Sequence, residues 1–211
     1  IAAFTVVRDT GAIVPGDYAL HTRSGDLEIG VGADAVWMDM APPTDGPTFS
    51  EEEQGALYAA YGLSLADRPE GLEPQAVSTG LMDILLPVRD LDTLDRAVQN
   101  EAEVTRLSEH YNVVGVHMFC PHTPDAAAHC RNFAPLYAIP EEAATGTSNG
   151  ALTYYLFRRG LIQAGADNRF VQGEKMGKPS EILSRITEDN GSVKVRVGGR
   201  ALITLKCELM G

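Results

Sequence analysis

The apolar run Ala151–Phe157 most strongly constrains what this chain can fold into. Its residues, ALTYYLF, are apolar on nearly every side, so a helix formed here must be surrounded by protein rather than lie on a surface. The later part of the chain changes to a period of two, with alternating apolar residues in Glu181–Ile186 and Val193–Val197 and a turn signal at Asn190-Gly191. Together these patterns predict an α+β fold in which antiparallel strands wrap around a buried helix.

The segment Ile139–Gly150, which leads into this helix, contains the best candidates for chemistry. Two adjacent carboxylates, Glu141 and Glu142, precede a turn of small residues. That turn enters the helix through Thr145, Gly146, Thr147 and Ser148. The first N–H groups of a helix have no partner within it, so they can hold a substrate carboxylate, and a neighbouring carboxylate can then move a proton. The same residues also fit an ordinary N-cap with two solvated glutamates beside the positive end of the helix dipole.

Two other polar segments that contain glycine allow a similar pair of interpretations. Gln172-Gly173 and the following Met176–Ser180 fit a connection that needs positive φ at its glycines, or part of a ligand pocket. Ser78-Thr79-Gly80 fits a β-bulge, or a close approach of the backbone to a ligand. Neither segment decides between structure and function by itself.

Charge and cysteine content exclude several classes of protein. The chain has 17 Lys and Arg against 29 Asp and Glu, a formal net charge of −12, which disfavours nucleic acid and anionic membrane surfaces as partners. Three cysteines provide no disulfide framework, which fits a cytoplasmic protein, and no apolar stretch reaches the ~18 residues that span a bilayer. The histidines and cysteines between His117 and Cys130 lack the spacing of a closed zinc site, so we expect no metal.

Local signals predict the remaining elements. Ile1–Thr10 fits a strand or a helix, and Tyr18–Met40 alternates as an antiparallel meander. Ala41–Thr48, rich in Pro and Gly, is predicted as a linker, and Ser50 with Glu53 forms a capping box for the helix that follows. Further predictions are a strand over Val77–Val88 interrupted at Gly80, a short helix capped by Asp92, a helix over Ala102–His110, strands over Val113–Phe119, Arg131–Leu136 and Ile203–Leu209, and a turn at Gly198-Gly199.

Five blocks of sequence gain meaning when they are considered jointly. They are LHTRSGDLEIGV at Leu20–Val31, RNFAP at Arg131–Pro135, IPEEAATGTSNG at Ile139–Gly150, QGEKMGKPS at Gln172–Ser180 and VRVGGRALI at Val195–Ile203. In order and spacing these blocks resemble the PhzF-like family of isomerases, the phenazine biosynthesis-like proteins, which are relatives in fold of diaminopimelate epimerase.

The resemblance implies a diaminopimelate epimerase-like fold with two similar lobes, each an antiparallel sheet or barrel around a central helix, and an active site in the cleft between them. Residues 1–43 would end the first lobe, residues 48–197 would form the second, and residues 198–211 would be a terminal strand that can return to the first. The family's glutamate base and its G-H-A-T motif belong to the first lobe, ahead of the matched part. We therefore expect the C-terminal three quarters of the family's chain, with an incomplete first lobe and the missing segment in a longer parent chain or a companion chain.

The resemblance further implies a homodimeric, cofactor-independent isomerase or epimerase that moves a proton, and with it a double bond, on a small anionic, carboxylated metabolite by general acid-base catalysis. Glu142 would shuttle the proton, and Thr147 would hydrogen-bond the substrate or position the acid, although the family usually has Asp and Ser there. The substrate-binding residues would be Thr145, Gly146, Ser148, Gly173, Ser78, Thr79 and Gly80. The alternative is a non-catalytic member of the fold that binds a small metabolite or a protein, and a third class is a purely structural lobe.

Overall fold

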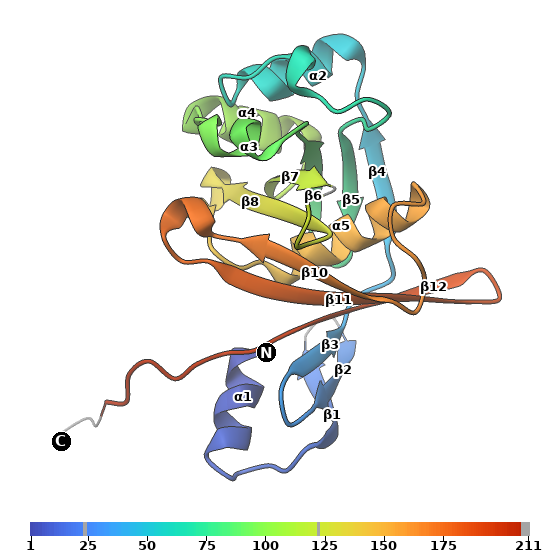
Figure 1. The fold of residues 1–211 in the computed structure, drawn as a ribbon, viewed down its shortest axis with the longest axis vertical. Coiled ribbons are helices and arrows are strands. Elements are labelled where there is room, and N and C mark those ends of the chain that lie inside the picture. The colour runs from blue at the N-terminus through green and yellow to red at the C-terminus, as the bar shows by residue number, and fades with distance from the viewer. Residues whose placement is uncertain (23–24, 122, 208–211) are drawn as a thin grey trace. The chain divides into compact units, whose positions relative to one another are not determined.

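The computed structural model describes residues 1–22, 25–121 and 123–207 (Figure 1). The chain divides into two compact units, one made of Ile1–Asp39 together with the residues from Gly198 onward, and the other of Met40–Val197. None of the described helices is long and apolar enough to cross a membrane.

The first unit is a three-stranded meander with one helix. Its elements are α1 (Ala2–Asp9), β1 (Gly16–Thr22), β2 (Gly25–Val31) and β3 (Val36–Asp39). β2 pairs antiparallel with both β1 and β3, which confirms the predicted meander. The N-terminal segment, which the sequence left open between strand and helix, is helical and is followed by Gly11 at a φ of +76°. Phe4 of this helix packs against a small core that contains Ile29 and Val36.

The second unit is built on a single sheet. Its strands are β4 (Thr44–Thr48), β5 (Gln75–Ser78), β6 (Met82–Pro87), β7 (Gly115–Pro121), β8 (Ala128–Ala134), β9 (Ile139–Glu142), β10 (Asp167–Gln172), β11 (Ser180–Asp189) and β12 (Ser192–Gly199). They follow the order β12-β11-β10-β8-β7-β6-β5-β4, and β9 also pairs with β8. The α-helices are α2 (Glu51–Ala59), α3 (Leu91–Arg96), α4 (Glu101–Tyr111) and α5 (Gly146–Arg158). Short 3-10 helices occupy Leu65–Asp67, Pro135–Tyr137 and Glu174–Met176.

This sheet is mixed, which corrects the prediction of an antiparallel one. β6 runs parallel to β7, and β8 runs parallel to β10. Parallel neighbours need a long crossover connection. α3 and α4 lie in the connection from β6 to β7, and α5 lies in the connection from β8 to β10. Side chains alternate between the faces of a strand in either direction, so the period-two pattern could not distinguish parallel from antiparallel pairing.

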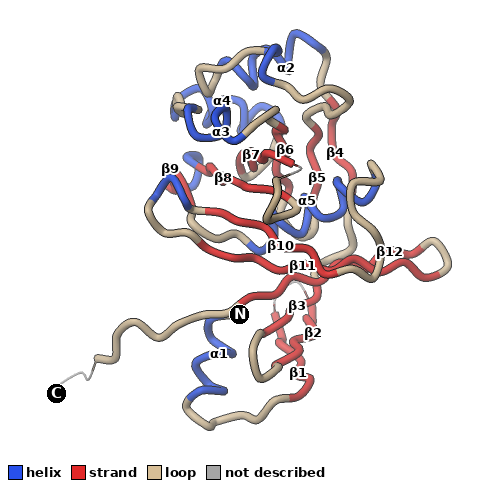
Figure 2. The backbone as a smooth tube through the Cα atoms, viewed as in Figure 1, coloured by secondary structure: helices blue, strands red, loops and turns tan. Residues whose placement is uncertain are grey.

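α5 is surrounded by protein, as its apolar composition predicted. Every residue from Ser148 to Leu156 is buried. The helix packs against β5, β6 and β11, which are not all neighbours in the sheet, so the sheet curls around it (Figure 2). Apolar residues of α5 share one core with Phe119 and Phe170. A second core, which contains Tyr58 and Leu107, fills the space between the sheet and the other three helices.

Two segments of the second unit differ from their predictions. The expected linker Ala41–Thr48 contains β4, an edge strand that pairs with β5. Its Pro47 is compatible with a strand because an edge position leaves one side of the backbone unpaired. The strand expected over Val77–Val88, with an interruption at Gly80, is two strands, the hairpin of β5 and β6. The interruption is confirmed, because Gly80 lies at the turn between them with a φ of +137°.

The structure confirms one predicted helix cap and corrects another. Ser50 and Glu53 form the expected capping box at the start of α2. Asp90, rather than Asp92, caps α3, because its carboxylate accepts the Thr93 backbone N–H at 2.7 Å. The sequence offered two aspartates two positions apart, and only the backbone conformation shows which one lies at the cap.

The C-terminal predictions were wrong in the part of the chain that the structure describes. Gly198-Gly199 belongs to β12 instead of forming a turn. Of the strand predicted over Ile203–Leu209, residues 203–207 have no regular structure, and the last two positions lie outside the described residues. An alternating pattern becomes a strand only where a neighbouring strand supplies hydrogen bonds to the backbone.

Candidate active site

Glu142 ends β9 and lies half-buried, just ahead of α5. Its carboxylate Oε2 accepts a hydrogen bond from the Thr145 hydroxyl at 2.7 Å. Its backbone carbonyl accepts a second one, also at 2.7 Å, from the Gln172 side chain. The predicted proton shuttle is therefore fixed through both its side chain and its backbone.

Gln172 joins β10 to this segment and to α5. It is fully buried, and its Nε2 donates to the Glu142 carbonyl and, at 3.1 Å, to the Thr145 hydroxyl. Its Oε1 accepts the Thr145 backbone N–H at 3.3 Å and the Asn149 side chain at 2.8 Å. The sequence analysis named Gln172 only as part of the segment Gln172-Gly173 and of the block QGEKMGKPS, and gave its side chain no role.

The N-terminus of α5 presents backbone donors beside Glu142. Thr145 is the N-cap residue, but its side chain makes no capping bond, since its hydroxyl donates to Glu142 instead. The N–H groups of Gly146 and Thr147 belong to the first turn, where no carbonyl partner exists within the helix and the dipole is positive. The buried Thr79 hydroxyl holds this turn by donating to the Thr147 carbonyl at 2.9 Å. The arrangement can hold a carboxylate next to a proton-transfer group.

Three of the predicted substrate-binding residues make other contacts. Ser148 is only 1% exposed, and its hydroxyl donates to Asp83 at 2.5 Å, so this side chain points into the protein. Ser78 accepts the Gly80 N–H at 3.1 Å within the turn between β5 and β6. Substrate contacts from these residues stay predictions. Of the other predicted site residues, Thr145 bonds directly to Glu142, and Thr79 bonds to the Thr147 carbonyl.

Gly173 supports the backbone that follows Glu142. It takes a φ of +85°, and a Cβ atom added to it would clash with the Lys178 carbonyl and lie 2.8 Å from the Ala143 carbonyl oxygen. Ala143 is the next residue after Glu142. Both the positive φ and the lack of space therefore require glycine at this position.

We expect Gly173→Ala to lower the free energy of unfolding by about 2 to 5 kcal/mol. The alanine backbone would be strained in the left-handed conformation, and its Cβ atom would overlap the carbonyls of Lys178 and Ala143. Gly177→Ala is the matched control. Gly177 also has a positive φ, +65°, but a Cβ atom there would meet nothing within 4 Å. Its cost should be only the strain of about 1 to 2 kcal/mol. Urea unfolding of both variants measures the difference, and equal losses would contradict the packing role of Gly173.

The neighbouring carboxylate, Glu141, has a different environment. Arg131 pairs with it in a two-pronged contact, with both N···O distances at 2.9 Å. The same guanidinium donates to the carbonyls of Leu94 and Ala97, at 3.0 and 2.8 Å, near the end of α3. Successive residues of a strand point to opposite faces, which explains why two adjacent glutamates have separate partners. Glu141 thus anchors β9 and leaves Glu142 as the candidate acid.

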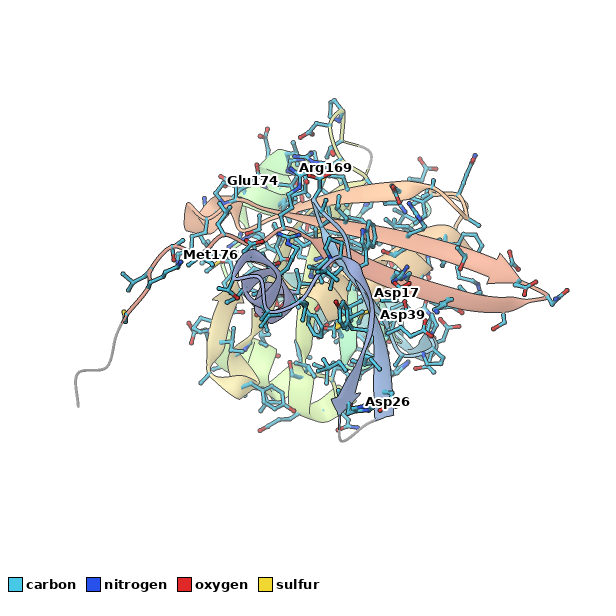
Figure 3. The ribbon with its side chains drawn as sticks, turned by 90° about the horizontal axis from the view of Figure 1, so that it is seen from below. Asp17, Asp26, Asp39, Arg169, Glu174 and Met176 are labelled. Carbon is cyan, nitrogen blue, oxygen red and sulfur yellow. The ribbon has the colours of Figure 1, made fainter. Side chains whose placement is uncertain are left out.

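The buried thiols and histidines serve structure. Burial raises the pKa of the Cys120 thiol to about 11, and it raises the pKa of Cys130 well above its usual value, so both are protonated at neutral pH. The ring of His129 lies between two carboxylates. Its Nδ1 is 2.6 Å from Glu174 Oε2, and its Nε2 is 3.1 Å from Asp125 Oδ1. Arg169 adds a positive charge to this group, because its guanidinium lies 3.4 Å from a carboxylate oxygen of Asp125. Glu174 and Arg169 are labelled in Figure 3. Over the described ranges, no three His, Cys, Asp or Glu side chains gather closely enough to hold a metal ion.

Comparison with known proteins gives a consistent result. The family model PhzC-PhzF, described as phenazine biosynthesis-like protein, matches residues 1–207. An uncharacterised isomerase of Deinococcus radiodurans is 32% identical over 186 residues, which cover 84% of this chain and 58% of that protein. The chain thus spans less than two thirds of that relative. A trans-2,3-dihydro-3-hydroxyanthranilate isomerase of Pseudomonas chlororaphis is 40% identical over 55 residues, 26% of this chain and 20% of that protein.

A solved structure supports the fold. The phenazine biosynthesis protein of the PhzF family from Bacillus anthracis superposes with a TM-score of 0.83 at 23% identity. The similarity covers 92% of this chain and 69% of that one. At this identity the similarity establishes the architecture alone.

Proposed function

This chain belongs to the PhzC-PhzF family of phenazine biosynthesis-like proteins, and from that membership and the geometry around Glu142 we propose that it takes part in a cofactor-independent isomerisation of a small carboxylated metabolite. Several of its relatives are named isomerases. The proposed reaction moves one proton between two positions of the substrate, and with it a double bond.

The observation that carries the proposal is the direct link between Glu142 and the first turn of α5. The Thr145 hydroxyl bonds to the carboxylate at 2.7 Å. The N–H groups that follow Thr145 have no carbonyl partner within the helix, so they can bind an anion. Proton removal next to a carboxylate or carbonyl places negative charge on oxygen, and preformed N–H donors stabilise that charge. The end of β9 and the start of α5 would thus combine proton transfer with charge stabilisation.

In the proposed mechanism, ionised Glu142 accepts a proton from a carbon atom of the substrate. The electron pair of the broken C–H bond forms a new double bond and shifts charge onto oxygen atoms at the N–H groups of Gly146 and Thr147. Protonated Glu142 then returns the proton to a different carbon on the same face of the substrate, and the double bond moves with it. Thr147 hydrogen-bonds the substrate, and the reaction consumes no other reagent.

The substrate class is a small cyclic or amino-acid-like carboxylate. One relative is named an isomerase of trans-2,3-dihydro-3-hydroxyanthranilate, which has this character. The proposal includes a homodimer, as the family resemblance implied.

Deuterium exchange tests the proposal without requiring that the product be identified. The protein is incubated in D2O with a panel of small cyclic carboxylates that includes trans-2,3-dihydro-3-hydroxyanthranilate, and mass spectrometry follows the substrates. We expect one of them to gain deuterium at carbon, since a proton held on Glu142 exchanges with solvent before it returns. If ligands bind by NMR but none exchanges, the isomerase proposal is overturned.

That second outcome would support the alternative, a non-catalytic metabolite-binding protein. A specific observation favours it: Glu142 and Thr147 occupy positions where the family usually has Asp and Ser. A longer carboxylate arm displaces the acid by about 1 Å, and misplacement of that size can cost ~100-fold in rate.

A further inference from the structure

A chain of buried polar side chains lies beneath the first turn of α5. It links His117 on β7, Asn132 on β8, Ser148 on α5 and Asp83 on β6, none of them more than 4% exposed. Asn132 Nδ2 lies 3.1 Å from His117 Nδ1 and 2.9 Å from the Ser148 hydroxyl, which in turn lies 2.5 Å from an Asp83 oxygen. The chain joins three strands of the sheet to the element that carries the candidate site.

The hydrogen bonds in this chain have a defined direction. Burial lowers the pKa of His117 to about 4, so its ring is neutral at pH 7 and its Nδ1 accepts from the Asn132 amide. The other N–H of that amide donates to Ser148, whose own proton is then directed to Asp83. Asp83 also accepts the Gly115 backbone N–H. The carboxyl group of Asp83 is thus an acceptor toward both of its neighbours.

Burying a carboxylate costs free energy that an apolar side chain at the same position would not. The burial of Asp83 therefore indicates a role that needs a carboxylate. We propose that Asp83 is a positioning residue which, through the Ser148 hydroxyl, holds the first turn of α5 in the orientation that the substrate anion requires. This inference rests on the proposed function. Thr79 secures the same turn at the Thr147 carbonyl, and Gln172 secures it at Thr145.

The surroundings of Asp83 give this role a pH dependence. Burial raises its pKa to about 6, while the hydrogen bonds from Ser148 and Gly115 oppose that rise and repulsion from Glu142 adds to it. Glu142 on β9 is thus the charged group that acts on Asp83, and His117 on β7, at the other end of the hydrogen-bonded chain, is neutral. A carboxylate accepts from both neighbours more strongly than a carboxylic acid does. The turn should be held best above pH 6.

The effect of Asp83 on stability has the opposite sign. A carboxyl group whose pKa is higher in the folded than in the unfolded protein binds a proton more tightly when folded. Its favourable contribution is complete below the unfolded value, near 3.8, and is lost as pH rises to about 6. Ionised Asp83 thus orders the site but makes the fold less stable, which distinguishes a positioning role from a purely structural one.

The test compares Asp83→Asn, which weakens the hydrogen bond from Ser148 because a neutral amide oxygen replaces a charged acceptor, with Ser148→Ala, which removes that bond. At pH 7.5 we expect the backbone amides of Asn149 and Gly150 to exchange with solvent roughly tenfold faster in both variants. Combining the substitutions should add little to the effect of Ser148→Ala alone, because both act on the same hydrogen bond. Asp92→Asn, an exposed carboxylate on α3, serves as the control.

Two further readouts use pH. The melting temperature of the wild type, relative to that of Asp83→Asn, should fall as pH rises from about 4 to 6. In contrast, kcat/KM of the wild type should increase as pH rises through about 6, and this increase should be absent in Asp83→Asn. Unchanged amide exchange, or a pH profile that persists in Asp83→Asn, overturns the inference. If the wild type shows no isomerase activity, the proposed function fails, while amide exchange and melting still decide whether Asp83 holds the turn.

Discussion

Replacing Glu142 by Gln is expected to lower isomerase turnover by at least ~100-fold, since positioned acid-base groups contribute about 10² to 10⁴ in rate. The amide is nearly isosteric with the carboxylate, and its oxygen can still accept the Thr145 hydroxyl that lies at 2.7 Å. It cannot take up or release a proton at neutral pH. The substitution therefore removes the chemistry and leaves the half-buried site in place. Steady-state rates on the substrate found by deuterium exchange measure the loss.

Two variants make this experiment specific. Glu103→Gln changes a carboxylate on α4 that pairs with Arg106 at the surface, and it should leave turnover unchanged. Glu142→Asp retains an acid and introduces the residue that the family usually has, so it should keep more activity than Glu142→Gln. Equal turnover in the wild type and Glu142→Gln would remove Glu142 from the mechanism and favour a binding role.

Replacing Arg131 by Met is expected to lower the free energy of unfolding by about 3 to 5 kcal/mol, the range found when one partner of a buried ion pair is removed. The Arg131 side chain is 9% exposed and that of Glu141 is 17% exposed. Methionine fills much of the space but leaves the Glu141 carboxylate and the carbonyls of Leu94 and Ala97 without the donors they now have. The cation also lies 4.9 Å from the centre of the Phe133 ring, a contact that methionine retains only in part.

Urea unfolding gives the loss for Arg131→Met, and a double variant identifies its cause. Adding Glu141→Gln removes the unpaired charge, so Arg131→Met with Glu141→Gln should be more stable than Arg131→Met alone. Arg106→Met, which breaks the surface pair with Glu103, should cost less than about 1 kcal/mol. A loss for Arg131→Met as small as that for Arg106→Met would show that the buried pair does not anchor β9.

These two predictions assign different roles to adjacent carboxylates. Glu141 faces a buried guanidinium and fastens β9 to the end of α3, whereas Glu142 faces Thr145 and the start of α5. Arg131→Met should therefore reduce stability first and activity only indirectly, while Glu142→Gln should do the reverse. Measuring both quantities on both variants tests the assignment as a whole.

The sequence by itself determined the parts of this protein that local chemistry controls. A helix that is apolar on nearly every side must be surrounded by protein, and α5 is buried from Ser148 to Leu156. The capping box at Ser50 and the meander before Met40 depend on residues close together in the chain, and both formed as predicted. The motif that contains Glu142 and Thr145 likewise placed the candidate acid next to the start of a helix.

Only the tertiary structure decided which distant residues meet. Parallel pairing of β8 with β10 depends on the path of α5 between them, and alternation is the same in either direction. Asp83 and Ser148 are 65 positions apart, and Gln172 reaches Glu142 from 30 positions away. No local pattern marks a glutamine or an aspartate for burial, because that cost is repaid only by partners that folding brings within hydrogen-bonding distance.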